Sequence, residues 1–188
     1  MTGAPTGHVS VVLVEGRSDR AALHALADRR GRDLESEGVS VVVMGGITNL
    51  HHHLQINLGS DKSVLGMYDA GEEWIVAQAF ERIGLGGRRS RDDLERLGFY
   101  VCVEDLEDEL LRALGPDAAI EFIESQGELP TFRRMQSQPA WRGRPVEDQL
   151  RRFCGIRSGR KERYGRGLVE SLDADRIPRP LEAILDLA

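Results

Sequence analysis

The chain has 188 residues, of which 40% are apolar and 30% are charged, and its formal net charge is −6. This length suits one domain, or one domain with a small appendage, and it allows a core without disulfides. The composition excludes a disordered chain, and no apolar run approaches the ~20 residues that a membrane-spanning helix needs.

Two runs rich in β-branched residues, 9–14 and 39–44, predict strands that are buried on both faces, as in a parallel sheet. Between them, residues 18–37 have a helical pattern that begins at the N-cap candidate Ser18 and stops before Gly38. A strand, a helix and a second strand in this order predict two parallel strands with a right-handed connection.

The alternation of helices and strands continues to about Gly115. Further helices are predicted at 47–58, 72–83 and 105–114, and further strands at 63–68 and 99–103. Residues 84–91 are rich in glycine and arginine, and we expect a mobile loop there.

After Gly115 the strand-like runs stop, and the remaining patterns are helical, at 118–126, 146–153, 158–172 and 180–187. The predicted fold class is therefore α/β, with a mostly parallel four-stranded sheet flanked by helices. We expect residues 1–115 to form an α/β catalytic core and residues 116–188 to form a helical, basic C-terminal extension packed on it.

The charge is unevenly distributed along the chain. Residues 131–166, here called the basic arm, contain eleven Lys/Arg and three Asp/Glu, a net charge of +8, whereas the rest of the chain carries −14. This division fits a metal-dependent enzyme that acts on a polyanion, because carboxylates bind cations and arginines bind phosphates. The alternative is a solvated helical face with mixed salt bridges. In the first case we expect phosphate contacts from Arg151, Arg152, Arg160 and Arg163.

Acidic residues follow three of the four predicted strands. Glu15 and Asp19 follow the first, Asp69 follows the third, and Asp105 and Glu107 follow the fourth. Ligands of open parallel sheets bind at the carboxyl ends of the strands, so these side chains are expected to gather there. A hard divalent cation such as Mg²⁺ relieves the repulsion between carboxylates. The alternative, an interaction with a helix dipole, accounts for Asp19 and Glu107 but poorly for Glu15 and Asp69.

These residues resemble a known family. The segment 14–19 (VEGRSD), the pair Gly45-Gly46 and Asp69 after the third strand resemble the TOPRIM domain of topoisomerases, primases and related nucleases. The later segments 105–107 (DLE) and 160–164 (RKERY) are closer to the TOPRIM part of OLD-family (overcoming lysogenization defect) nucleases. The resemblance implies a Rossmann-like TOPRIM fold across the whole α/β core.

The resemblance also implies a site for one or two Mg²⁺ or Mn²⁺ ions. In the family pattern Glu15 is a metal ligand or a general acid/base, and Asp19 and Asp69 hold the same metal. Asp105 and Glu107 supply a second metal position.

A late lysine and one departure from the pattern complete the implied site. Lys161 is implied as a catalytic cation that faces the charge developing on the phosphorane. The TOPRIM pattern has Asp-x-Asp after the third strand, where this chain has Asp69-Ala70-Gly71. Glu72 or Glu73 could replace the missing carboxylate with a different reach. The departure leaves open whether one metal position is filled and whether the chain is catalytic.

The function implied by the resemblance is that of a divalent-metal-dependent nuclease or related phosphodiester-processing domain, with DNA favoured over RNA. A nucleotidyltransferase and a non-catalytic nucleic-acid-binding or regulatory module are alternatives. A phospho-receiver domain fits less well, because such domains carry a pair of acids directly after the first strand.

OLD-family proteins usually carry a P-loop ATPase, but this chain lacks G-x-x-x-x-G-K-[ST]. We therefore expect a stand-alone domain for which a separate ATPase protein is a candidate partner. A homodimer stays open, and no membrane association is expected.

Four smaller features complete the sequence-based expectations. Trp141 lies among arginines and is a candidate for either core packing or base stacking. The pair Gly45-Gly46 fits either a phosphate cradle at a helix N-terminus or a tight turn. Residues 1–8 lack a secretory signal, and the unpatterned Cys102 and Cys154 favour reduced thiols in the cytoplasm.

Overall fold

The structure is a computed structural model, and it describes residues 9–58, 62–85, 89–155 and 158–188. Three sequence-based expectations concern residues that the structure does not describe. The N-terminal segment 1–8, the centre of the expected loop at 86–88, and Arg157 of the basic arm lie outside the described residues.

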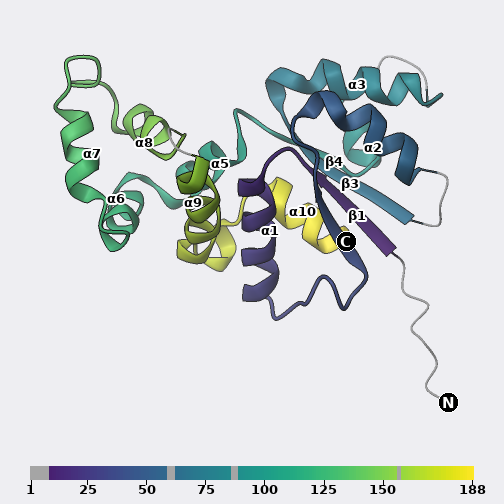
Figure 1. The fold of residues 1–188 in the computed structure, drawn as a ribbon, viewed down its shortest axis with the longest axis horizontal. Coiled ribbons are helices and arrows are strands. Elements are labelled where there is room, and N and C mark those ends of the chain that lie inside the picture. The colour runs from purple at the N-terminus through teal and green to yellow at the C-terminus, as the bar shows by residue number, and fades with distance from the viewer. Residues whose placement is uncertain (1–8, 59–61, 86–88, 156–157) are drawn as a thin grey trace.

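Four parallel strands form one sheet in the order β2-β1-β3-β4 (Figure 1). They are β1 (Val9–Val14), β2 (Val39–Val43), β3 (Lys62–Asp69) and β4 (Phe99–Cys102). Each bound lies within one residue of its prediction, and the α/β fold with a four-stranded parallel sheet is confirmed. Because β1 and β3 are neighbours, the residues that follow them come together at one edge of the sheet.

Helices connect the strands and continue after them. Up to residue 114 they are α1 (Arg17–Arg29), η1 (Ile47–Asn49), α2 (Leu50–Asn57), η2 (Ala70–Glu72), α3 (Glu73–Arg82), α4 (Arg91–Arg96) and α5 (Leu106–Leu114). Beyond it they are α6 (Pro116–Ser125), α7 (Leu129–Gln136), α8 (Val146–Gly155), α9 (Ser158–Ser171), η3 (Ala174–Arg176) and α10 (Arg179–Leu187).

Two apolar clusters cover the two faces of the sheet, because alternate strand residues point to opposite faces. Val12 and Val14 belong to the cluster with α1, α5, α9 and α10, whereas Val11 and Leu13 belong to the cluster with α2, α3 and α4. Figure 1 shows α2 and α3 on one side of the sheet and α1 and α10 on the other, with α6, α7 and α8 extending away from it.

The first helix is shorter than its sequence pattern predicts. The expected helix over 18–37 is wrong in its C-terminal half, because α1 ends at Arg29. Gly31 has φ +67°, its N–H donates to the carbonyl of Asp28, and the N–H of Arg32 donates to the carbonyl of Ala27. These bonds close a Schellman-type C-cap that only a residue tolerant of positive φ completes readily.

The C-terminal helices are not all separate from the sheet. The last helix, α10, packs against β3, β4 and α1, and it buries Leu181, Ile184 and Leu185. The division into residues 1–115 and 116–188 remains a proposal, in which α10 returns to cover the sheet. No helix within the described residues is both long and apolar enough to cross a membrane.

Candidate metal centre

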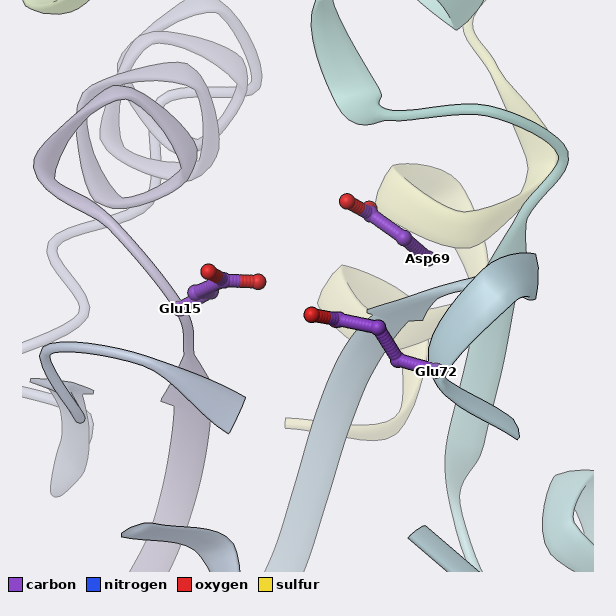
Figure 2. Close-up of side chains that lie close together, drawn as sticks. All are labelled: Glu15, Asp69 and Glu72. Carbon is purple, nitrogen blue, oxygen red and sulfur yellow. The ribbon is translucent and has the colours of Figure 1, made fainter. Parts of the chain in front are cut away.

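Three carboxylates converge beyond the ends of β1 and β3 (Figure 2). Glu15 directly follows β1, Asp69 is the last residue of β3, and Glu72 ends η2. One oxygen from each side chain lies within 4.8 Å of the other two. Figure 2 shows the three side chains pointing toward one another across the strand ends.

The short helix η2 determines which glutamate joins Glu15 and Asp69. Side chains at i and i+3 eclipse in a 3-10 turn, so Glu72 lies on the same side as Asp69. Glu73, one residue later, begins α3 and instead pairs with Arg91, with 2.9 Å between Oε2 and Nη2. The sequence left Glu72 and Glu73 as alternatives, and the structure brings Glu72 to the cluster.

The clustered carboxylates are electrostatically strained without a cation. Burial, followed by the nearby charges of Glu72 and Glu15, raises the pKa of Asp69 to about 7. Burial and the charge of Glu15 likewise raise the pKa of Glu72 to about 7. The Oε2 atom of Glu72 is buried and has no hydrogen-bond partner among the residues that the structure describes. Closely spaced oxygens that repel one another, one of them unsatisfied, fit the donor set of a hard divalent cation.

Asp19 lines the same pocket, of about 430 Å³, but is not one of the three clustered carboxylates. Its Oδ2 accepts a hydrogen bond of 2.8 Å from the N–H of Gly16 at the start of α1. Burial, then the charges of Glu107 and Glu15, raises the pKa of Asp19 to about 7. Asp19 is therefore placed at the edge of the cluster and partly engaged in capping the helix.

Asp105, Glu107 and Lys161 line another side of the pocket. Asp105 is the N-cap of α5, and its Oδ1 accepts a hydrogen bond of 2.7 Å from the N–H of Asp108. Glu107 is only 6% exposed, and its Oε1 has no hydrogen-bond partner in the described part of the chain. That atom lies 3.7 Å from Nζ of Lys161. The pocket therefore brings all six residues expected from the sequence to one place, although Asp105 also has a structural role.

A close helix contact brings Lys161 to the pocket. At Gly165, one turn after Lys161 on α9, an added Cβ would lie 2.7 Å from the backbone oxygen of Ser18 at the start of α1. Only glycine permits this approach of α9 to α1, and the contact holds the N-terminal half of α9 over the pocket. Sequence reasoning did not identify Gly165, whose role depends on a neighbour about 150 residues earlier.

The basic arm divides into paired and unpaired arginines. Arg160 is only 7% exposed, its Nε lies 2.7 Å from Oε2 of Glu128, and its guanidinium lies 4.1 Å from the ring centroid of Phe153. The expected phosphate contact is therefore wrong for Arg160, which belongs to the interior. Arg151 pairs with Asp108 at 2.5 Å, and Arg163 pairs with Glu128 at 2.5 Å. Arg152 is exposed and makes no ion pair within the described chain.

The pair Gly45-Gly46 is part of a tight turn. Both residues have positive φ, +72° and +125°, and the N–H of Gly45 donates to the carbonyl of Glu15 at 3.1 Å. That N–H is unavailable to a phosphate, so the geometry favours the turn over the phosphate cradle at Gly45.

Comparisons with known proteins agree with this arrangement. Residues 9–70, which include β1, β2, β3 and two of the three clustered carboxylates, match the model of the "Overcoming lysogenization defect protein-like, TOPRIM domain" family. This segment of the chain is therefore similar to OLD-like TOPRIM domains. No curated protein matches the chain.

Solved structures extend the likeness to most of the chain. The C-terminal region of the Xanthomonas campestris pv. campestris OLD protein superposes with a TM-score of 0.71 at 21% identity, covering 95% of this chain and 91% of that chain. The C-terminal region of the Burkholderia pseudomallei OLD protein gives 0.66 at 19% identity, covering 96% of each chain. These TM-scores and coverages show a shared fold that includes the helices after residue 115.

Proposed function

We propose that this chain is a TOPRIM domain that acts as a divalent-metal-dependent nuclease, or as a related phosphodiester-processing domain, on DNA in preference to RNA. The observation that supports this most directly is the convergence of Glu15, Asp69 and Glu72, with Lys161 lining the same pocket. Clustered hard oxygen donors beside a cation are the arrangement that phosphoryl transfer needs.

The proposed metal ligands are Glu15, Asp69 and Glu72 for one Mg²⁺ or Mn²⁺ ion. Asp105 and Glu107 are proposed for a second position, and Asp19, which lines the same pocket, is proposed to support the first ion. When bound, such an ion polarises a phosphoryl oxygen and lowers the pKa of a bound water.

Side chains of the pocket would supply proton transfer and charge stabilisation. In hydrolysis a water oxygen forms a bond to phosphorus, the bond to the leaving oxygen breaks, and a proton moves from the water to that oxygen. Glu15, at the end of β1, is proposed to hold or relay this proton, because its carboxylate opens into the pocket. The ammonium of Lys161 is proposed to stabilise charge on the phosphoryl oxygens.

One observation favours a second function, a non-catalytic nucleic-acid-binding module. Gly71 stands where the TOPRIM pattern has a second aspartate, and nothing lies within 4 Å of a Cβ added there. The space for that aspartate is thus available, but its carboxylate is missing. Glu72 is proposed to supply the charge from the next position, which makes the catalytic function the better supported one.

A cleavage assay tests the proposal. Supercoiled plasmid and structured RNA are incubated with Mg²⁺ or Mn²⁺, using the natural chain, Glu15→Gln and the matched control Glu73→Gln. We expect plasmid cleavage that Glu15→Gln abolishes and Glu73→Gln preserves, because Glu73 pairs with Arg91 outside the cluster. Absence of cleavage with either metal would instead support the binding module. Unchanged cleavage by Glu15→Gln would contradict the assigned site.

The proposed partner is a separate ATPase protein. The similar solved structures are C-terminal regions of OLD proteins, and the chain contains no P-loop motif. ATP hydrolysis, where it accompanies the reaction, is proposed to be supplied by that partner.

A further inference from the structure

A tryptophan with two arginines over its ring lies between α7 and α8. The guanidinium carbons of Arg144 and Arg152 lie 5.0 and 5.9 Å from the ring centroid of Trp141. Two hollows, of about 390 and 200 Å³, adjoin this group, and Trp141 and Arg152 line both of them. Trp141, Arg144 and Arg152 are here called the tryptophan platform. None of its side chains belongs to the metal centre.

Buried hydrogen bonds hold the platform in place. Gln149 on α8 is only 6% exposed, and its Nε2 donates to the carbonyls of Trp141 and Arg144 at 2.9 and 3.1 Å. Its Oε1 accepts a bond of 2.5 Å from Nε2 of Gln136 on α7. A buried amide is stable only when its donors and acceptor are satisfied, so this network fixes the loop between α7 and α8. The platform is therefore preorganised.

The unpaired charges of the basic arm gather around the platform. Arg134 and Arg142, like Arg144 and Arg152, are exposed and form no ion pair in the part of the chain that the structure describes. By contrast, Arg151, Arg160 and Arg163 of the basic arm are paired with carboxylates. Asp148 also lines the larger hollow and forms no ion pair within the described residues. The surface thus combines an aromatic ring, four guanidinium groups without a carboxylate partner among those residues, and one carboxylate acceptor.

We propose that the tryptophan platform binds a single-stranded segment of nucleic acid, with one unpaired base stacked on Trp141. Stacking on an aromatic ring is open to any unpaired base, whereas a duplex hides the faces of its bases. The surrounding guanidinium groups would bind the adjacent phosphates and stack on neighbouring bases. Asp148 would accept from a base amino group. The inference rests on the proposed function and deepens it, because it names the form of nucleic acid that the chain engages.

The platform connects to the metal centre through packed helices. Arg151, beside Arg152 on α8, binds Asp108 of α5 through Nη2 and Oδ1 at 2.5 Å. Asp108 follows Glu107, which lines the pocket. A strand held at the platform would therefore lie on a helix that is bonded directly to the wall of the metal centre. This arrangement suits a substrate with a single-stranded end or gap next to the bond that is processed.

Fluorescence of Trp141 provides a direct test. The chain has two tryptophans, so Trp74→Phe leaves Trp141 as the only indole. This background is titrated, in EDTA and at low salt, with DNA and RNA strands of about 12 nucleotides and with abasic strands of the same length. We expect base-containing strands to quench the fluorescence and to bind roughly tenfold more tightly than abasic strands. Quenching by the DNA strand, the RNA strand or both supports the proposal and identifies the accepted sugar.

Two variants separate stacking from charge and from folding. In the natural chain, anisotropy of labelled strands should show that Trp141→Leu removes the preference for bases while leaving the affinity for abasic strands unchanged. Trp141→Phe should keep most of the preference, which excludes a folding defect as the cause. An unchanged preference in Trp141→Leu, or equal binding of base-containing and abasic strands by the natural chain, would overturn the inference alone. Failure to bind any strand or plasmid would overturn the proposed function as well.

Discussion

The Nζ atom of Lys161 lies 3.7 Å from Oε1 of Glu107, a buried atom without a hydrogen-bond partner in residues 9–58, 62–85, 89–155 and 158–188. The two residues come from α9 and α5, and both line the pocket beside Glu15 and Asp69. Lys161 and Glu107 form an ion pair at the wall of the pocket, at a separation longer than a hydrogen bond. We propose that a phosphate bound at the metal centre would meet this ammonium.

Lys161→Met should lower the rate of cleavage far more than the affinity for nucleic acid. A cation that meets transition-state charge contributes mainly to turnover, and losing one such group reduces the rate by ~10²–10³. Single-turnover rates and dissociation constants, measured side by side, test this. Lys62→Met is the matched control, because Lys62 is the other lysine of the chain and is exposed on β3. If affinity falls while the rate per bound complex is unchanged, Lys161 is a binding residue.

The stability of the metal-free protein should fall as the pH rises from about 4 to about 7. Burial and neighbouring carboxylates raise the pKa values of Asp69 and Glu72 to about 7, above the ordinary values of 3.8 and 4.5. The folded state thus binds more protons than the unfolded chain in this window, so its stability is lost as these groups ionise. Mn²⁺ should restore the stability above about pH 7, because the cation compensates the ionised carboxylates.

Thermal unfolding midpoints across this pH range, with and without Mn²⁺, measure the effect. Glu72→Gln should have a shallower pH dependence than the natural chain, because it removes one titrating group and lowers the pKa of its neighbour Asp69. Identical pH profiles for the two proteins would contradict the electrostatic account of the cluster.

Glu128→Ala should destabilise the fold by about 3–5 kcal/mol, because it leaves the buried guanidinium of Arg160 without a counter-charge. The same carboxylate also accepts from the hydroxyl of Tyr164 at 2.9 Å. Glu95→Ala is the control, since Glu95 pairs with the largely exposed Arg179, and such a pair contributes at most about 1 kcal/mol. Urea unfolding compares the two variants. Equal losses of stability would mean that Arg160 is not dependent on its buried partner.

The strands and the carboxylates that follow them were predictable from the sequence. Continuous β-branched runs such as that of β1 indicate strands buried on both faces. In a parallel sheet, the residues that follow the strands all lie at the same edge of the sheet. Glu15 and Asp69 could be identified on that basis. The end of α1 was missed because polar residues after Arg29 kept a helical pattern, although Gly31 was the available signal.

Other features depend on geometry that residue spacing does not reveal. Whether Glu72 or Glu73 joins Asp69 is decided by the single 3-10 turn of η2, and a shift of one residue would exchange them. Arg160 and Arg152 have similar sequence surroundings in the basic arm. Arg160 is nevertheless buried against the rings of Phe153 and Tyr164, whereas Arg152 is exposed. Helices α4 and α7 are short, and neither was predicted.

Titration calorimetry with Mn²⁺ tests the metal centre most directly. The natural chain is compared with Asp69→Asn, Glu72→Gln and the control Glu73→Gln, at a pH above about 7 where the clustered carboxylates are ionised. The account predicts Mn²⁺ binding that Asp69→Asn and Glu72→Gln weaken strongly and that Glu73→Gln leaves unchanged. Binding that is unaffected by Asp69→Asn and Glu72→Gln would contradict it.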